Sequence, residues 1–155
     1  MVNGLAFRLV GRSEDLDDLV QDCFVQALRS LDSLENPAVF SSWLSGIVAR
    51  TSYNFIRKRR MLARLGLGRT SDDRIDVDAL VAPTAPPDVA AELRALYGVL
   101  SALPAKVRVP LVLRRVEGMA LAEIAATLGA SLATVKRRVA EGEAALTRAM
   151  MGESR

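Results

Sequence analysis

The amino-acid sequence predicts an all-α protein built from two small helical domains that a flexible linker joins. Apolar residues recur three and four positions apart over most of the 155 residues, the spacing that gives a helix one apolar face. No stretch of useful length alternates apolar and polar residues as a strand does. The helical spacing fades over residues 66–87, where acidic residues, glycines and three prolines gather. We therefore predict domains at residues 1–65 and 88–155 and a linker at residues 66–87.

The first domain is predicted to begin with two helices. Residues 2–10 are apolar and are expected to form a short helix, or the end of a longer one, that ends near Gly11. Ser13 and the two acids after it are typical of the start of a second helix, which runs to about Leu31. The apolar residues of that helix form one stripe, made of Leu16, Leu19, Val20, Cys23, Phe24, Ala27, Leu28 and Leu31. The acidic edge beside the stripe, made of Asp17, Asp18, Gln21 and Asp22, either faces solvent or meets a basic partner protein.

A third helix is predicted to start at Asn36–Pro37 or at Ser41–Ser42 and to end in the basic run 57–60. Cations at a helix C-terminus gain from the helix dipole, but four in succession exceed that need and surround the helix. Trp43, Tyr53 and Phe55 lie upstream, and aromatic residues beside a basic run are expected of a surface that holds phosphates and stacks unpaired bases. Phe40 and Trp43 also have the spacing of core residues, and we interpret both as core.

The second domain is predicted to begin with a helix that starts at Pro87 and Asp88. Its inward residues are Val89, Leu93, Leu96, Tyr97 and Leu100. Another helix begins at Pro104 and ends at Gly118, with Val107, Leu111, Val112 and Val116 in the core. Pro110 removes one backbone hydrogen bond, so it either bends this helix or delays its start.

Residues 121–146 have the pattern of two helices folded across a tight turn. Leu121, Ile124, Ala125 and Leu128 share one face, Gly129 ends that helix, and Ser131 or Thr134 caps the next. In the second helix Leu132, Val135, Val139 and Leu146 point inward, which leaves Thr134, Arg137 and Arg138 outward and Lys136 on the flank. This pattern is typical of a helix-turn-helix, whose second helix can enter the DNA major groove. A helical hairpin inside a plain bundle has the same spacing.

Composition excludes several functions. The content of 50% hydrophobic and 25% charged residues is that of a folded domain, and no apolar run is long enough to cross a membrane, so we expect a cytoplasmic protein. Cys23 is the only cysteine and histidine is missing, which excludes an internal disulfide, zinc sites of Cys and His, and Ser–His–Asp or Cys–His catalysis. We expect no catalytic residues, no metal, no cofactor and no small-molecule substrate.

The charges alternate in blocks along the chain. Residues 1–35 carry three basic and seven acidic side chains, and residues 36–70 carry seven basic and none acidic. Residues 71–103 carry two basic and six acidic side chains, and residues 104–155 carry nine and five. Two basic segments fit two separate contacts with a polyanion, while simple alternation of charged helices is the other interpretation.

Several motifs follow one another in a characteristic order. They are Asp17-Asp18-Leu19-Val20-Gln21-Asp22-Cys23-Phe24, Phe40-Ser41-Ser42-Trp43-Leu44, Ile56-Arg57-Lys58-Arg59-Arg60, Leu103-Pro104, Glu117-Gly118, Ala122-Glu123-Ile124-Ala125 and Thr134-Val135-Lys136-Arg137-Arg138. In this order and spacing they resemble a bacterial sigma factor of the small extracytoplasmic-function type, over about residues 5–148.

The resemblance implies that residues 1–65 bind the clamp of core RNA polymerase and melt the minus-ten promoter element, while residues 88–150 read the minus-thirty-five element. At matching positions, the clamp contacts would be Asp18, Gln21 and Asp22. The contacts near the non-template strand would be Arg50, Tyr53, Asn54, Arg57 and Lys58, with Arg59 and Arg60 continuing the basic run. On or beside the major-groove face would be Ser131, Thr134, Lys136, Arg137 and Arg138. The implied partners are core RNA polymerase, promoter DNA and an anti-sigma factor.

The chain departs from the family pattern at several places. The pattern begins further upstream, so the first helix is expected to be short and Met1 need not be the natural start. Arg50 and Asn54 stand where the family often has Asn and Asp, and Ser45-Gly46 replaces a bulkier pair. Glu141-Gly142-Glu143 stands where basic residues are common, and two acids there would repel phosphate. A sigma-like interaction protein that binds polymerase or an anti-sigma factor without productive initiation therefore remains an alternative to an initiation factor, whereas no catalytic constellation supports an enzyme.

Overall fold

The computed structural model describes residues 1–11, 16–67 and 86–152. Over these ranges it contains seven α-helices and two short 3-10 helices, and no strand. The first half holds α1 (Val2–Val10), α2 (Leu16–Arg29), the 3-10 helices η1 (Leu31–Ser33) and η2 (Pro37–Val39), and α3 (Phe40–Arg64). The second half holds α4 (Pro87–Ala102), α5 (Ala105–Arg115), α6 (Leu121–Leu128) and α7 (Leu132–Met150). The predicted all-α class is confirmed, while most of the predicted linker, residues 68–85, lies outside the described residues.

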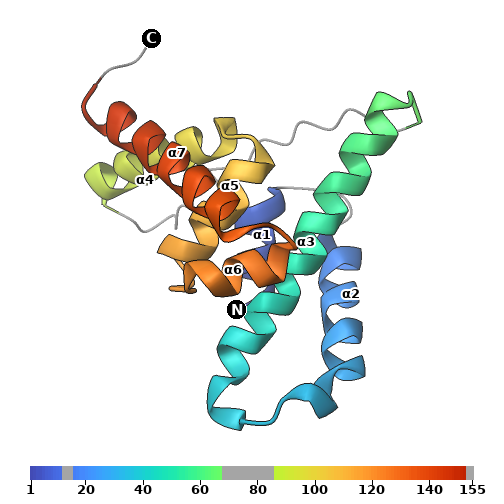
Figure 1. Cartoon of the computed structure of the whole chain (residues 1–155). Coiled ribbons are helices and arrows are strands. Elements are labelled where there is room, and N and C mark those ends of the chain that lie inside the picture. Colours follow the sequence, from blue (N-terminus) through green and yellow to red (C-terminus); the bar gives the residue numbers. More distant parts are fainter. Residues whose placement is uncertain (12–15, 68–85, 153–155) are drawn as a thin grey trace.

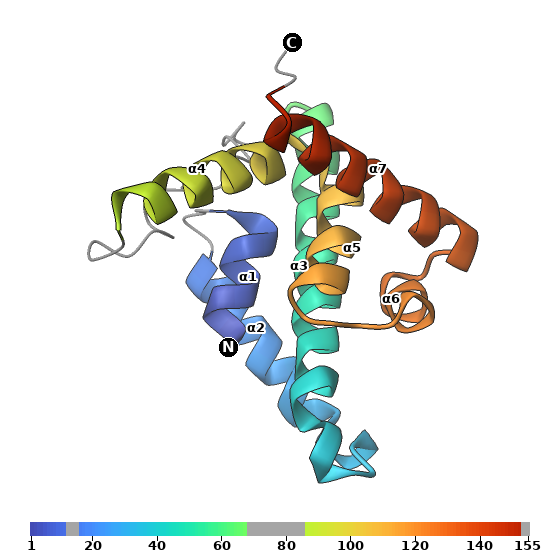
Figure 2. The same cartoon turned by 90° about the vertical axis from the view of Figure 1, so that its left-hand side faces the viewer.

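The longest helix, α3, is the central element of the molecule (Figure 1). Its 25 residues span about 38 Å, since an α-helix rises 1.5 Å per residue. Figure 2 shows α1 and α2 on one side of α3, α6 on the other, and α5 in front of α3, running along it. The helix α7 packs on α5 and α6, and α4 packs against α7.

The first helix, α1, is the most buried element of the N-terminal half. Its side chains Leu5, Ala6 and Leu9 are almost fully enclosed because α1 packs against α2, α3 and α5 together. Gly11 ends the helix with a φ of 82°, a left-handed backbone that glycine adopts without steric cost. The predicted short helix and its stop are confirmed. Ser13, the predicted cap of the next helix, lies outside the described residues.

The apolar stripe predicted on α2 is only partly buried. Leu19 and Cys23 are enclosed between α1 and α3, but Phe24 is 49% exposed and Leu28 is 73% exposed. The apolar stripe is therefore not buried along its whole length, because α2 is covered along one edge and its far end extends past α1 (Figure 2). The same holds for α4, where Val89 and Leu96 are exposed although we expected them inward.

Pro110 does not delay the start of α5, which begins at Ala105 directly after Pro104. The fully buried side chains of α5 include Val107, Val109 and Leu113, because α5 lies against α1, α3, α6 and α7. Arg108 is also 1% exposed, and its Nη1 donates to the carbonyl oxygen of Ser101 at 3.5 Å. Val116, expected in the core, is exposed because α5 has already ended at Arg115.

The helix-turn-helix forms as predicted. Gly129 ends α6 with a φ of 60° and a ψ of 39°, the left-handed conformation that a helix stop often needs. Ser131 caps α7, since its Oγ accepts from the backbone N–H of Thr134 at 3.2 Å. Leu132 is 41% exposed rather than inward, because it is the first residue of α7 and precedes the contact with α5.

The two halves of the chain share one apolar core. Leu9 of α1 and Val48 of α3 belong to the same buried cluster as Leu113 of α5 and Ile124 of α6. Direct contacts of α5 with α1 and α3, and of α6 with α3, close this core. The predicted pair of helical groups is present, and the two groups lie packed against each other.

Candidate nucleic-acid and partner interfaces

The second helix of the helix-turn-helix is held by close packing on α5. Val135 and Val139 are buried, and Gly142 continues their face. A Cβ atom added to Gly142 would lie 2.8 Å from Cδ2 of Leu111, closer than real Cβ atoms come, and 3.3 Å from Cγ1 of Val107, a tight contact. The glycine that weakens an isolated helix therefore permits α7 to rest directly on α5.

The predicted major-groove residues differ in how far they face solvent. Ser131, Lys136 and Arg137 are exposed, with Arg137 opposite the buried face and Lys136 on one flank. Arg138 lies on the other flank and is half-buried. Thr134 is also half-buried, and its Oγ1 accepts a hydrogen bond from Oγ of Ser131 at 2.8 Å. Arg137 thus points directly away from the face that packs on α5.

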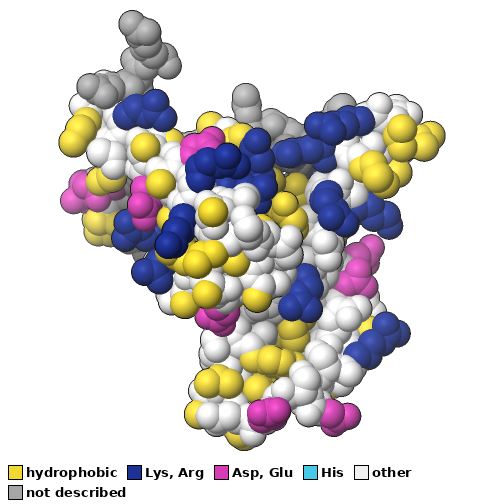
Figure 3. All heavy atoms as spheres, in the orientation of Figure 1, with side chains coloured by type: hydrophobic (Ala, Val, Ile, Leu, Met, Phe, Trp, Pro, Cys, Tyr) yellow, Lys and Arg dark blue, Asp and Glu magenta, His cyan; other side chains and the backbone are white. Residues whose placement is uncertain are grey.

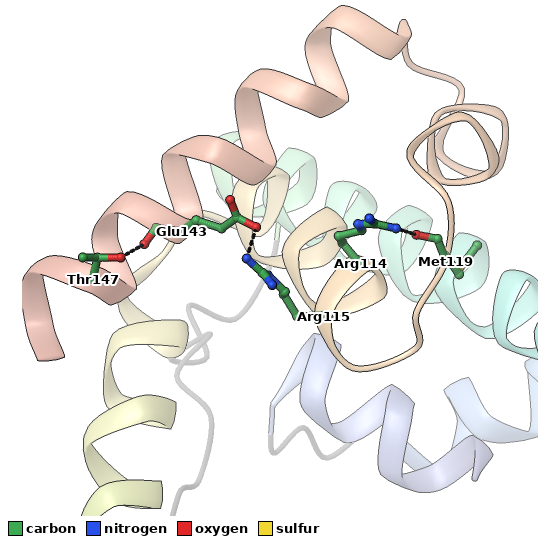
Figure 4. A network of polar contacts seen from close by, with 5 residues as sticks. All are labelled: Arg114, Arg115, Met119, Glu143 and Thr147. Atoms are coloured by element: carbon green, nitrogen blue, oxygen red, sulfur yellow. Dashed lines mark hydrogen bonds and ion pairs between the residues drawn. The ribbon is translucent and has the colours of Figure 1, made fainter.

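The acids that follow this face have different surroundings. Glu143 turns toward α5, where its Oε1 lies 2.7 Å from Nη2 of Arg115 (Figure 4). Its backbone oxygen accepts from Oγ1 of Thr147 at 3.0 Å. Glu141 is exposed one turn beyond Arg137. Glu143 is therefore paired with a cation of its own domain, and Glu141 alone faces outward beside the basic residues.

A second polar stripe runs along α3. Its members are spaced as one helix face, opposite the side that packs on α1 and α5. They are Arg50, Tyr53, Asn54, Arg57 and Lys58, all exposed except Tyr53, which is half-buried. The predicted residues therefore come together on one surface, which we call the α3 stripe.

The end of the basic run has two different environments. Arg60 is exposed, whereas Arg59 is half-buried with its guanidinium carbon 5.7 Å from the centre of the Phe55 ring. That distance is within the range of a cation–π contact. The helix continues to Arg64, so the run lies inside α3 rather than at its end. Figure 3 shows Lys and Arg side chains gathered over the upper part of the molecule, from the C-terminal helices to the upper end of α3.

An open groove of about 510 Å³ lies between α2 and α3. Its apolar wall includes Leu19, Ile47 and Phe55. Its polar lining comes from both helices and consists of Asp22, Gln26, Ser30, Arg50, Thr51, Asn54 and Lys58. Three residues of the α3 stripe thus border a hollow that has an apolar and aromatic wall.

The predicted polymerase-binding residues lie on the outer edge of α2. Asp18, Gln21 and Asp22 are exposed, as is Asp17 beside them. Asp22 also lines the groove with Arg50 and Lys58, so the acidic edge and the α3 stripe adjoin there. Periodicity could place each residue on its own helix but could not predict that they share a hollow.

The sequence did not predict one polar contact of the turn between α5 and α6. Ser45 Oγ of α3 donates to Oε2 of Glu117 at 2.8 Å, and Nη1 of Arg8 lies 3.9 Å from Oε1 of Glu117. The signal in the sequence was the Glu117-Gly118 motif, which carried no predicted role.

No three His, Cys, Asp or Glu side chains of the described residues are placed to hold a metal ion. None of the helices in the described ranges combines the length and apolar character that a bilayer crossing requires.

Two regions of the chain match models of known protein families. Residues 1–61 match the family model for Sigma-70 region 2, and residues 93–146 match that for Sigma-70, region 4. The chain is 32% identical over 145 residues to the ECF RNA polymerase sigma factor SigE of Mycolicibacterium smegmatis, with 89% of this chain and 52% of that protein covered. It is 30% identical to the RNA polymerase sigma factor SigV of Bacillus subtilis over 87% of this chain and 75% of that protein.

A solved structure has the same fold. It is the sigma factor RpoE of Bartonella quintana in complex with the anti-sigma factor NepR, with a TM-score of 0.72 and 24% identity. The superposition covers 97% of this chain and 89% of that one. The chain spans about half the length of the M. smegmatis relative and three quarters of the B. subtilis one. With both sigma regions matched in order and relatives along nearly its whole length, the chain belongs to the extracytoplasmic-function sigma factors of RNA polymerase.

Proposed function

We propose that this sigma factor binds core RNA polymerase in the cytoplasm, directs it to a two-part promoter and opens the duplex without catalysing a bond change. One observation carries the proposal. Two separate polar surfaces, the α3 stripe and the outward face of α7, lie in the two regions that match the sigma family. Two surfaces on one chain suit two contacts with one duplex.

The outward face of α7 is suited to the minus-thirty-five element. Arg137 is exposed near the N-terminal end of this helix, where a recognition helix contacts base edges. A guanidinium can donate two hydrogen bonds to one guanine, which discriminates between bases. Lys136 and Arg138 flank it and are suited to phosphates, which fix the position of the helix.

The α3 stripe and its groove are suited to a melted minus-ten element. A base held out of the stack needs an apolar or aromatic wall and hydrogen-bonding groups around it. The groove has Phe55 and Ile47 in its wall and Arg50, Asn54 and Lys58 at its border. Arg50 and Lys58 can bind phosphates of the single strand while the groove receives a base.

The acidic edge of α2 is suited to a basic protein surface. Asp18, Gln21 and Asp22 are exposed together, and we assign them to the clamp of core polymerase. An anti-sigma factor is the proposed regulatory partner. The B. quintana protein of the same fold is described in complex with the anti-sigma factor NepR, which supports this assignment.

Run-off transcription tests the proposal directly. Purified core enzyme and the chain are incubated with the DNA upstream of the chain's own gene, and with a control template in which that DNA is scrambled. We expect a defined transcript from the first template only, and only when the chain is present. Tight binding to core enzyme with no transcript from either template would reject the proposal.

A sigma-like interaction protein is the second candidate. Glu141 favours it, because an exposed acid one turn beyond Arg137 opposes phosphate binding by α7. Glu141→Gln separates the two candidates. An initiation factor should gain promoter affinity from this change, whereas an interaction protein that does not use DNA should show no difference.

A further inference from the structure

The C-terminal end of α3 projects from the body of the molecule (Figure 1). The last buried residue of this helix is Ile56, and about two further turns follow it. Gly66 ends the helix with a φ of 68° and donates its N–H to the carbonyl oxygen of Ala63 at 3.2 Å. The N–H of Leu67 donates to the carbonyl oxygen of Leu62 at 3.0 Å. These two bonds form a Schellman stop, which folds the chain back over the helix end.

Three large apolar side chains are exposed at this end of α3. Met61 is 56% exposed, Leu65 is 63% exposed and Leu67 is 76% exposed. Met61 and Leu65 lie four positions apart and so share one side, and the stop holds Leu67 beside the helix end. Figure 3 shows hydrophobic side chains at the upper end of α3. Single exposed apolar residues are ordinary, but a group of them marks an interaction site. We call this group the apolar tip.

Cations surround the apolar tip. Arg57, Lys58 and Arg64 lie three or four positions from Met61 on the same side of the helix, and Arg60 lies beside them. All four cations are exposed. Residues 36–70 include no acidic side chain that could offset this charge within the segment. A complementary partner therefore has an anionic surface with apolar material directly behind it.

A lipid bilayer fits this description better than nucleic acid or another protein. DNA phosphates would engage the cations, but stacking on bases uses aromatic side chains, and the apolar tip has none. The groove between α2 and α3 reaches Lys58 but is not lined by the apolar tip, so the tip is a projecting surface rather than a receiving one. At a bilayer, apolar side chains enter the boundary between headgroups and acyl chains. Lysine and arginine around them extend to the headgroup phosphates.

We propose that the apolar tip and the cations around it dock the protein on the surface of an anionic lipid bilayer. Arg57 and Lys58 belong to the α3 stripe, so a docked chain cannot offer them to DNA at the same time. Docking and the binding of single-stranded DNA by α3 therefore exclude each other. Docking itself requires neither core polymerase nor a promoter, so it can be measured whether or not the chain starts transcription.

Co-sedimentation with vesicles tests the proposal. The wild type should bind vesicles of phosphatidylglycerol and phosphatidylethanolamine, but not vesicles of phosphatidylcholine alone. The triple variant Met61→Ser, Leu65→Ser and Leu67→Ser keeps every cation. It should bind the anionic vesicles at least about tenfold more weakly and single-stranded DNA as well as the wild type does. Met150→Ser with Met151→Ser, which replaces two exposed methionines at the end of α7, is the matched control and should change neither affinity.

Three outcomes of this experiment would overturn the proposal. One is a wild type that does not bind the anionic vesicles. Another is a triple variant that binds them as well as the wild type, which would reduce the contact to adsorption by charge alone. The third is an equal loss of affinity for vesicles and for single-stranded DNA, which would place the apolar tip in the nucleic-acid surface.

Tryptophan fluorescence tests the depth of the contact independently. Trp43 is the only tryptophan and lies 18 residues before Met61 in α3, about 27 Å away along the helix axis. Acyl chains carrying bromine quench a tryptophan that reaches them. In anionic vesicles of such lipids, Met61→Trp with Trp43→Phe should be quenched and the wild type should not, and excess single-stranded DNA should reverse the quenching. Emission of the double variant that is unchanged by the brominated lipids, or quenching that DNA does not reverse, would contradict the proposal.

Discussion

Gly142 shows how a single residue sets the position of α7 on α5. Gly142→Ala would place a methyl group 2.8 Å from Cδ2 of Leu111. Overpacking of this kind costs about 1–3 kcal/mol, more than the helix gains from losing a glycine. We expect the variant to lower the free energy of unfolding, measured by urea denaturation.

Gly98 is the matched control for that prediction. It lies inside α4, and a Cβ there would have no atom within 4 Å. Gly98→Ala should therefore raise the free energy of unfolding by up to about 1 kcal/mol. If Gly142→Ala were stabilising to the same extent, the close packing of α7 on α5 would be wrong.

Arg137 is predicted to read a base rather than a phosphate. Arg137→Ala should weaken binding to the minus-thirty-five element by about 1–3 kcal/mol more than binding to unrelated DNA, as fluorescence anisotropy can measure. Arg148→Ala, near the far end of the same helix, is the control and should affect both DNAs little. Equal losses on both DNAs for Arg137→Ala would reduce this residue to a phosphate contact.

The buried thiol of Cys23 should make the stability of the protein depend on pH. Burial raises the pKa of its thiol above the usual value, partly offset by a hydrogen bond with Thr51. As pH rises, the thiol of the unfolded chain therefore loses its proton before the thiol of the folded chain does. The contribution of Cys23 to the free energy of unfolding is complete below the pKa of the unfolded-state thiol. It is lost as pH rises through the pKa of the folded-state thiol. The free energy of unfolding of the wild type should fall more steeply above about pH 9 than that of Cys23→Ala. Parallel pH profiles would contradict this.

At the residue scale, periodicity predicted which positions face inward but not what they meet. Val135 and Val139 were placed correctly because helix spacing alone decides them. The role of Gly142 and the pairing of Glu143 with Arg115 depend on α5, which comes from another part of the sequence. The sequence analysis interpreted Glu143 as an acid that repels phosphate, whereas in the structure its carboxylate is paired with Arg115.

At the scale of one element, the α3 stripe predicts a measurable electrostatic effect. Arg57 and Lys58 of the stripe and the neighbouring Arg60 are exposed cations, and we propose that each contacts a phosphate. Replacing all three with alanine would then remove three phosphate contacts. The slope of log affinity against log salt should decrease by about 0.7 per lost contact on single-stranded minus-ten DNA.

Arg59→Ala is the control within the same helix. The guanidinium of Arg59 already lies over the ring of Phe55. Arg59→Ala should therefore change the salt slope less than the loss of one exposed cation does. An unchanged slope in the triple variant would leave the basic run without a role in DNA binding.

The apolar faces of α2 and α4 show what element-level prediction misses. Both helices have the predicted periodicity and both form, yet Leu28 and Leu96 are exposed. Periodicity reveals that a face is apolar, but whether another helix covers it depends on where the rest of the chain lies. On α5 the predicted inward residues Val107, Leu111 and Val112 are buried because other helices surround this one.

At the scale of the whole molecule, the sequence predicted two helical groups but not that they pack together. The hydrogen bond between Ser45 and Glu117 joins residues 72 positions apart, and no local pattern signals it. The departure from the family pattern at Ser45-Gly46 was visible, but its meaning required knowing that α6 lies opposite. The limits of the two domains stay predictions, since most of the linker is outside the described residues.

The most direct test of the whole account is the chemical reactivity of promoter thymines. Permanganate oxidises thymines that are unpaired, so it reports melting of the minus-ten element in the complex with core polymerase. We predict reactive thymines at that element only when core enzyme and the chain are both present, together with protection of the minus-thirty-five element from nuclease. A stable complex with core enzyme and promoter DNA in which every thymine stays unreactive would contradict the assignment of this chain as an initiation factor.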